Sequence, residues 1–175
     1  MERYKGNWNS VNTHTVPKWY EDCKFGIFIH WGIYSVPAFA PHTWELGEVD
    51  SKEWFADNPY AEWYYNSLNI GKGPTYEHHM EKYGKDFKYE DFIPMWKAEN
   101  WDPKQWAEIF KEAGAEYVVL TTKHHDGFCL FPSKYTHFNS VEMGPKRNIT
   151  GELTEAVRDA GIRMGLYYSG LIDWQ

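Results

Sequence analysis

Three short strand-like runs of this chain are each followed by polar ring side chains. The run 25–29 leads into His30, the run 117–122 into Lys123, His124 and His125, and the run 163–166 into Tyr167. Short apolar runs of this kind are typical of buried strands. Parallel strands of an α/β fold carry their C-terminal ends to one rim, where active sites lie. The three strand ends therefore predict one side of a polar pocket.

The adjacent pair His124 and His125 is more informative than the single His30, because a lone histidine after a buried strand is more often structural than ligand-binding. Adjacent residues of a strand point to opposite faces. Both rings can face one pocket only if the strand has already bent into its loop. Neutral imidazoles donate and accept hydrogen bonds, so such a pair suits the neighbouring hydroxyls of a sugar.

Two helices are expected between these strands. Asp102 is placed to cap the first, Pro103 suits its first position and Gly114 its end. Thr150 is the expected cap of the second, which ends at Gly161. The predicted buried stripes are Trp106, Ile109, Phe110 and Ala113 in the first helix, and Leu153, Ala156, Val157 and Ala160 in the second. The resulting β-α-β-α-β order predicts a parallel sheet with right-handed crossovers.

This order favours the first three βα units of a (β/α)₈ barrel with long βα loops. A dinucleotide-binding fold would show a Gly-x-Gly-x-x-Gly cluster after a strand, and the segment 29–34 has none. A barrel needs eight strands and about 250 residues, whereas this chain of 175 residues supplies three. An unclosed barrel also leaves a strand edge unpaired. We therefore expect residues 1–175 to be the N-terminal part of a larger barrel that is incomplete in this chain.

The composition excludes several classes of protein. The net charge of −7 disfavours a nucleic-acid partner, and no apolar run approaches the roughly 20 residues of a membrane span. Met1 is followed by a polar segment without a signal core, which predicts a cytoplasmic protein. Cys23 and Cys129 are too few for a disulfide framework. Aromatic residues make up 19%, so some rings are expected to line a pocket for a ligand with apolar faces and hydroxyls, such as a sugar. A homo-oligomer is compatible with these features.

Four segments of the chain resemble the α-L-fucosidases of glycoside hydrolase family 29. They are KFGIFIHWG at 24–32, NPYAEWY at 58–64, TTKHHDGF at 121–128 and GLYYS at 165–169. The resemblance extends from about Val16 to Trp174. It implies a (β/α)₈-like catalytic domain followed by a β-sandwich, a retaining mechanism, and no metal or other cofactor. By motif matching, the residues that fall on the fucose-binding positions of the family are His30, Glu62, Trp63, His124, His125 and Tyr167.

The resemblance also implies that the catalytic carboxylates lie outside these residues. The family's nucleophile is an aspartate in a Trp-Asn-Asp-like motif at a later strand end, and its acid/base is a glutamate further downstream. Neither occurs in this sequence. The expected ligands are α-L-fucosides, and the expected partner is the missing C-terminal part, which would complete the barrel and carry the β-sandwich. The alternative is a non-catalytic fucose-binding or complementing subunit of a split enzyme.

Four carboxylates are expected near the rim: Glu45, Glu62, Asp126 and Asp173. Retaining hydrolysis needs two carboxyl groups about 5–5.5 Å apart. Asp126 precedes Gly127 and is interpreted as a turn residue, Glu45 is expected to be solvated, and the position of Asp173 is left open. Glu62 lies among aromatic residues. It could hold a sugar hydroxyl or assist proton transfer, and the competing interpretation is a glutamate on a helix surface.

A metal site is the remaining competing interpretation. The segment 78–81 contains two histidines and a glutamate, the residue types of a metal-binding helix. It does not have the His-Glu-x-x-His order that places two imidazoles on one face. Barrel metallohydrolases use His-x-His on the first strand, where this chain has a single histidine. We therefore expect no metal site, and we expect His79 to lie on a solvated helix face.

Overall fold

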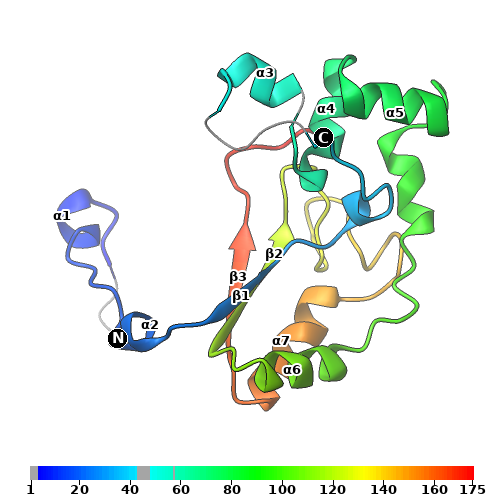
Figure 1. Cartoon of the computed structure of the whole chain (residues 1–175). Coiled ribbons are helices and arrows are strands. Elements are labelled where there is room, and N and C mark those ends of the chain that lie inside the picture. Colours follow the sequence, from blue (N-terminus) through cyan, green and yellow to red (C-terminus); the bar gives the residue numbers. More distant parts are fainter. Residues whose placement is uncertain (1–3, 43–47, 57) are drawn as a thin grey trace.

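The computed structural model describes residues 4–42, 48–56 and 58–175, and its sheet is parallel (Figure 1). Its strands are β1 Gly26–Ile29, β2 Tyr117–Lys123 and β3 Arg163–Tyr168. They pair in the order β1-β2-β3, with both neighbouring pairs parallel. The predicted β-α-β-α-β arrangement is therefore confirmed, and all three strands deliver their C-terminal ends to the same edge.

One face of the sheet packs on two helices, α6 Pro103–Glu112 and α7 Ile149–Asp159. Figure 1 shows α6 and α7 side by side, and the residues of the two helices are in contact. Val118 and Leu120 of β2 are fully buried in the core that these helices cover. Each buried side chain of this size contributes roughly 1.5–3 kcal/mol. The sheet and the two helices therefore form the rigid part that positions the strand ends.

The start and the end of α6 follow the sequence signals. The Asp102 side chain accepts hydrogen bonds from the backbone N–H groups of Lys104 and Gln105, and Pro103 occupies the first helical position. Gly114 follows the helix with φ of +83°, a left-handed conformation that glycine adopts without steric cost. These three residues act locally, which is why the sequence alone predicts this helix well.

Two details of the helices differ from expectation. The cap of α7 is Asn148, which accepts from the backbone N–H of Gly151 at 3.0 Å, so Thr150 lies inside the first turn and is not the cap. In α6, Ile109 is 54% exposed. The buried face is centred on Ala107 and Phe110, and Ile109 lies roughly 100° around the helix from Phe110 and 200° from Ala107. Ala113 is exposed as well.

The segment between β1 and α6 forms the cover of the strand ends. It contains α3 Ser51–Ala56, α4 Tyr64–Ile70 and α5 Pro74–Lys82, together with 3₁₀ turns at Ile33–Ser35, Ala61–Trp63 and Tyr89–Met95. Figure 1 shows α3, α4 and α5 gathered beyond the C-terminal ends of the strands. The long loop predicted here therefore lies where a site on the rim would need walls.

At the other end of the sheet, α1 Trp8–Val11 and α2 Lys18–Asp22 precede β1 (Figure 1). Trp19 and Tyr20 of α2 contact the ring of Tyr117 at the start of β2. In the described part of the chain, no helix combines the length and the apolar character that crossing a bilayer requires.

Candidate functional site

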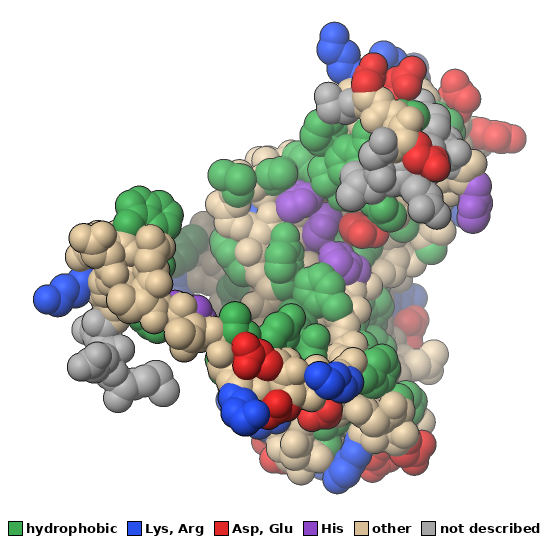
Figure 2. Space-filling model, turned by 60° about the vertical axis from the view of Figure 1, so that its left-hand side comes forward, with side chains coloured by type: hydrophobic (Ala, Val, Ile, Leu, Met, Phe, Trp, Pro, Cys, Tyr) green, Lys and Arg blue, Asp and Glu red, His purple; other side chains and the backbone are tan. Residues whose placement is uncertain are grey.

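Three histidines from neighbouring strand ends come together at the C-terminal rim of the sheet. The ring centroids of His30 and His124 are 5.3 Å apart, and those of His124 and His125 are 4.2 Å apart. His30 is exposed, His125 is half-buried and His124 is only 5% exposed. Figure 2 shows histidine side chains grouped beside hydrophobic surface on one face of the molecule. The ends of β1 and β2 therefore bring three imidazoles into one cluster.

A local irregularity explains how the adjacent histidines come to lie together. The pairing of β2 with β3 shifts register between Thr121 and Lys123, and β2 ends at Lys123. Such a bulge bends a strand and redirects the side chains that follow it. The rings of His124 and His125 are consequently neighbours and do not point to opposite faces. The bend on which a shared pocket depends is present in the structure.

Both imidazoles of the pair are held in the neutral form. Burial is the main cause that lowers the pKa of His124 to about 3, and the neighbouring His125, His30 and Lys123 act in the same direction. Burial also lowers the pKa of His125, with Lys123 and His30 contributing and Glu62 opposing. Neutral imidazoles each carry one donor and one acceptor, which suits hydroxyl groups better than anions.

Two tryptophans form an aromatic wall beside His125. The ring of Trp63 lies 5.4 Å from His125 and 5.0 Å from Trp174, and Trp174 lies 5.2 Å from His125. Trp63 was predicted as a site residue, whereas Trp174 was not. The only sequence signal for Trp174 is an aromatic residue soon after a strand end. Its position depends on the backbone hydrogen bond from its N–H to the His125 carbonyl oxygen.

Glu62 occupies the 3₁₀ turn Ala61–Trp63, directly before Trp63, and is half-buried. Its charge acts on His125, as described above, and on the buried Tyr34. The pKa of Tyr34 is raised by burial first and then by Asp126 and Glu62. Within the described residues, no hydrogen bond or ion pair of the Glu62 carboxylate is formed. The structure thus places Glu62 in a turn near the histidines, not on the surface of an isolated helix.

Tyr167 lies on the face of the sheet that α6 and α7 leave uncovered, and Phe28 connects it to the histidines. The ring of Phe28 lies 5.6 Å from Tyr167 and 5.0 Å from His30. Phe28 and His30 are two residues apart along β1 and its extension, so they share one face. Phe28 was not among the predicted site residues, although this spacing is a sequence signal that could have identified it. It adds an apolar surface between the phenol and the imidazole.

An ion pair ties the segment after β3 to the end of β2. The ammonium of the buried Lys123 lies 2.7 Å from the Asp173 carboxylate and donates to the Ser169 carbonyl oxygen at 2.9 Å. The Ser169 N–H donates in turn to the Lys123 carbonyl oxygen at 3.0 Å. Asp173, whose place the sequence left open, is therefore an ion-pair partner. The pair holds the segment that carries Trp174 over the histidines.

Asp126 is a buried turn residue, in line with its interpretation from the Asp-Gly sequence. It accepts hydrogen bonds from the Tyr89 hydroxyl at 2.8 Å and from the Phe128 N–H at 3.3 Å. Gly127 has φ of +83°, which favours glycine. Burial raises the pKa of Asp126 from 3.8 to about 6, although both hydrogen bonds act to lower it. The remaining predicted rim carboxylate, Glu45, lies outside the described residues.

We expect the Asp126→Asn variant to differ from the wild type in how stability depends on pH. The Asp126 carboxyl binds its proton more tightly in the folded state, so it stabilises the fold at low pH. This contribution, about 3 kcal/mol, is lost as the pH rises from about 4 to about 6. Asparagine does not titrate.

The measurement for Asp126 is urea unfolding of both proteins across this pH range. The difference, wild type minus variant, cancels the titration of His124 and should fall as the pH rises. A difference that stays constant from pH 4 to pH 6 would contradict the prediction.

The prediction that His79 lies on a solvated helix face is wrong, because its side chain is 0% exposed. Its Nδ1 is 2.9 Å from the Tyr64 hydroxyl, and its Nε2 donates to the Phe87 carbonyl oxygen at 2.8 Å. The sequence pattern of α5 does not reveal this burial, because the covering residues come from α4 and from the segment after α5. Among the described residues, no group of three or more His, Cys, Asp or Glu is placed to hold a metal ion.

Comparison with known proteins identifies the family of this chain. The sequence model of the alpha-L-fucosidase family matches residues 1–175. The chain belongs to the α-L-fucosidase family. Among curated relatives, it is 42% identical to an alpha-L-fucosidase of Dictyostelium discoideum over 177 residues, and 42% identical to the human plasma alpha-L-fucosidase over 175 residues.

The match covers nearly all of this chain and about a third of each relative. It spans 99% of the chain and 35% of the Dictyostelium fucosidase, and 98% of the chain and 33% of the human plasma fucosidase. The Thermotoga maritima alpha-fucosidase in complex with fucose is 57% identical, with a TM-score of 0.88, over 98% of this chain and 38% of that one. Another solved alpha-L-fucosidase is 60% identical, with a TM-score of 0.93, over 98% and 39%.

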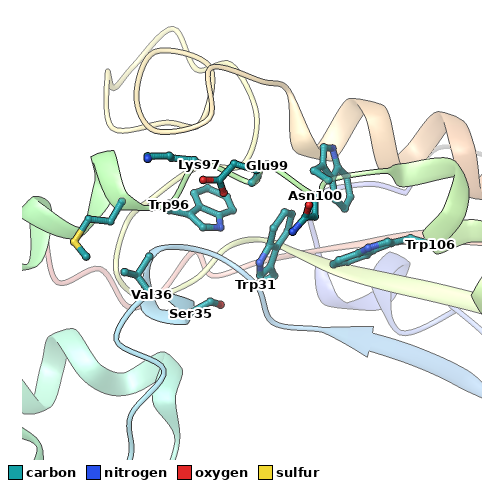
Figure 3. Close-up of a pocket in the computed structure, with 11 residues that line it drawn as sticks. Trp31, Ser35, Val36, Trp96, Lys97, Glu99, Asn100 and Trp106 are labelled. Carbon is teal, nitrogen blue, oxygen red and sulfur yellow. The ribbon is translucent and has the colours of Figure 1, made fainter.

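In this chain of the fucosidase family, the side chain of Trp31 lies away from the cluster of histidines. It follows His30 directly, but its side chain lines a separate half-open cavity of about 420 Å³ to which the histidines do not contribute. Figure 3 shows Trp31 between Trp96 and Trp106, and its ring lies 5.0 Å and 5.2 Å from theirs. Trp31 therefore takes no part in the cluster of histidines. The ring packs with other tryptophans instead.

Proposed function

We propose that this chain forms one side of the fucose pocket of an α-L-fucosidase, a retaining exo-glycosidase that releases terminal α-L-fucose. The observation that carries the proposal is the convergence of His30, His124 and His125 at one rim. It stands beside 57% identity to a solved fucosidase in complex with fucose. The neutral imidazoles of His124 and His125, the ring of His30 and the phenol of Tyr167 then bind the hydroxyls of the sugar.

The aromatic side chains account for the rest of the sugar surface. Fucose has an apolar side and a methyl group, and both pack well on aromatic rings. Trp63 supplies such a ring beside His125, and Phe28 supplies one between His30 and Tyr167. Glu62, with no partner among the described residues, is free to accept a hydrogen bond from a hydroxyl. The site thus combines polar groups that orient the sugar with apolar surfaces that exclude water.

The chemistry requires two further carboxyl groups, which we propose are supplied outside these 175 residues. An aspartate attacks the anomeric carbon through an oxocarbenium-like transition state, and a glutamate protonates the leaving oxygen. Of the candidate carboxylates described here, Asp126 bonds Tyr89 and Asp173 pairs with Lys123. In this proposal the remaining strands close a (β/α)₈ barrel along the open edge of the sheet and over its uncovered face.

The proposal predicts that this chain alone does not hydrolyse an aryl α-L-fucoside. Mixed with a polypeptide that corresponds to the rest of a related fucosidase, it should release nitrophenol at rates that approach the roughly 10 per second typical of enzymes. The measurement is nitrophenol release by the chain, by the second polypeptide and by the mixture. Activity of the chain alone would overturn the placement of the catalytic carboxylates. Binding of L-fucose by an inactive mixture would favour a non-catalytic fucose-binding subunit.

A further inference from the structure

Ser169 makes two contacts that together define where its proton lies. Its side chain is almost completely buried, and its Oγ lies 3.2 Å from the carbonyl oxygen of Ile172 and 2.6 Å from Nδ1 of His125. A hydroxyl has one proton to donate, and a carbonyl oxygen can only accept. Because the hydroxyl donates to Ile172, it accepts from His125. Nδ1 of His125 therefore carries a proton.

The second nitrogen of His125 is consequently an acceptor. A neutral imidazole carries one proton, so protonation at Nδ1 leaves a lone pair at Nε2. His125 is held in place at its backbone as well, because its carbonyl oxygen accepts from the Trp174 N–H at 2.8 Å. Burial lowers the pKa of the ring, which favours the neutral form. A ligand hydroxyl that meets Nε2 of His125 must donate.

His124 has the opposite arrangement. Its Nδ1 is buried, and within the described residues it has no hydrogen-bond partner. Buried N–H groups without an acceptor are rarer in proteins than acceptors without a donor. The proton of the neutral ring therefore belongs on Nε2. A ligand hydroxyl that meets Nε2 of His124 must accept.

We propose that Ser169 is a positioning residue that fixes the tautomer of His125, so that the adjacent histidines offer a sugar one acceptor and one donor. The acceptor is Nε2 of His125 and the donor is Nε2–H of His124. This inference rests on the proposed fucose site and deepens it. The pair binds two neighbouring hydroxyls only when one of them donates to His125 and the other accepts from His124. Two histidines of the same tautomer would not distinguish the two hydroxyls in this way.

The tautomers can be measured directly in the wild-type chain. Long-range ¹H–¹⁵N correlation spectra of the ¹⁵N-labelled protein should show a protonated, pyrrole-type Nδ1 and a bare, pyridine-type Nε2 for His125. His124 should show the reverse. Protonation of His125 at Nε2 would overturn the inference. L-fucose added to the same sample should shift the Nε2 signals of both rings.

Variants then test the role of Ser169. Ser169→Ala should leave His125 as a mixture of tautomers and weaken L-fucose binding about 3- to 10-fold, the usual effect of losing one hydrogen bond. Ser169→Thr, which keeps the hydroxyl, should restore the single tautomer. Ser140→Ala is the matched control, because the buried Ser140 hydroxyl donates to the Arg147 carbonyl oxygen at 2.7 Å and is not among the partners of an imidazole.

The outcomes separate the two proposals. An unchanged His125 tautomer in Ser169→Ala would overturn the role of Ser169, even if L-fucose still binds. The expected tautomers without any response to L-fucose, measured in the mixture of this chain with the complementary fucosidase polypeptide, would support the role of Ser169 and overturn the fucose site. Equal losses of binding in Ser169→Ala and Ser140→Ala would show a general loss of stability and would also overturn the positioning role.

Discussion

The variants His124→Ala and His125→Ala should each lower kcat/KM for an aryl α-L-fucoside roughly 30- to 1000-fold, or about 2–4 kcal/mol of transition-state binding. In the proposed fucose site, each substitution removes a hydrogen-bonding group and leaves a sugar hydroxyl without a partner. The measurement uses the active mixture of this chain with the complementary fucosidase polypeptide, and compares kcat and KM for each variant.

His137→Ala is the matched control for this experiment. His137 follows β2 on the same long loop as the pair, but its side chain is exposed and pairs with Glu142 at the surface. Surface pairs of this kind contribute little, so kcat/KM should remain close to the wild type. Neither a chelator nor added zinc should change the activity. Loss of activity with chelator and recovery with metal would show that the imidazoles are ligands, and would contradict the sugar-binding role.

The His79→Ala variant should lose about 3–5 kcal/mol of unfolding free energy, the largest stability effect that we expect from a single histidine. The ring is fully buried and contacts the rings of Tyr64, Phe87 and Phe92. Its removal leaves a cavity, and it also leaves the Tyr64 hydroxyl and the Phe87 carbonyl oxygen without their partner. Urea unfolding monitored by tryptophan fluorescence measures the loss.

Two comparisons keep the His79 prediction specific. His137→Ala should change the unfolding free energy by less than about 0.5 kcal/mol, as exposed substitutions usually do. In the fraction of His79→Ala that remains folded, the tautomers of His124 and His125 should be those of the wild type. A loss for His79→Ala as small as that for His137→Ala would mean that the ring is solvated, as the sequence pattern of α5 alone predicted.

Much of the scaffold could be predicted from the sequence because its signals are local. Strand-like runs of four to six residues predicted all three strands, and Asp102, Pro103 and Gly114 predicted the limits of α6. The parallel order then required the strand ends to meet at one rim. The sequence alone therefore predicts the histidines of this rim, because strand ends and their periodicity depend on neighbours in the sequence.

The tertiary structure decided what depends on residues far apart in the chain. The bulge that turns His124 and His125 to one side arises where β2 pairs with β3, about 45 residues later. The burial of His79 requires cover from α4 and from Phe87. Trp174 reaches His125 because Lys123 and Asp173 form an ion pair across the strands. Such contacts form only when the chain packs, and no local pattern in the sequence records them.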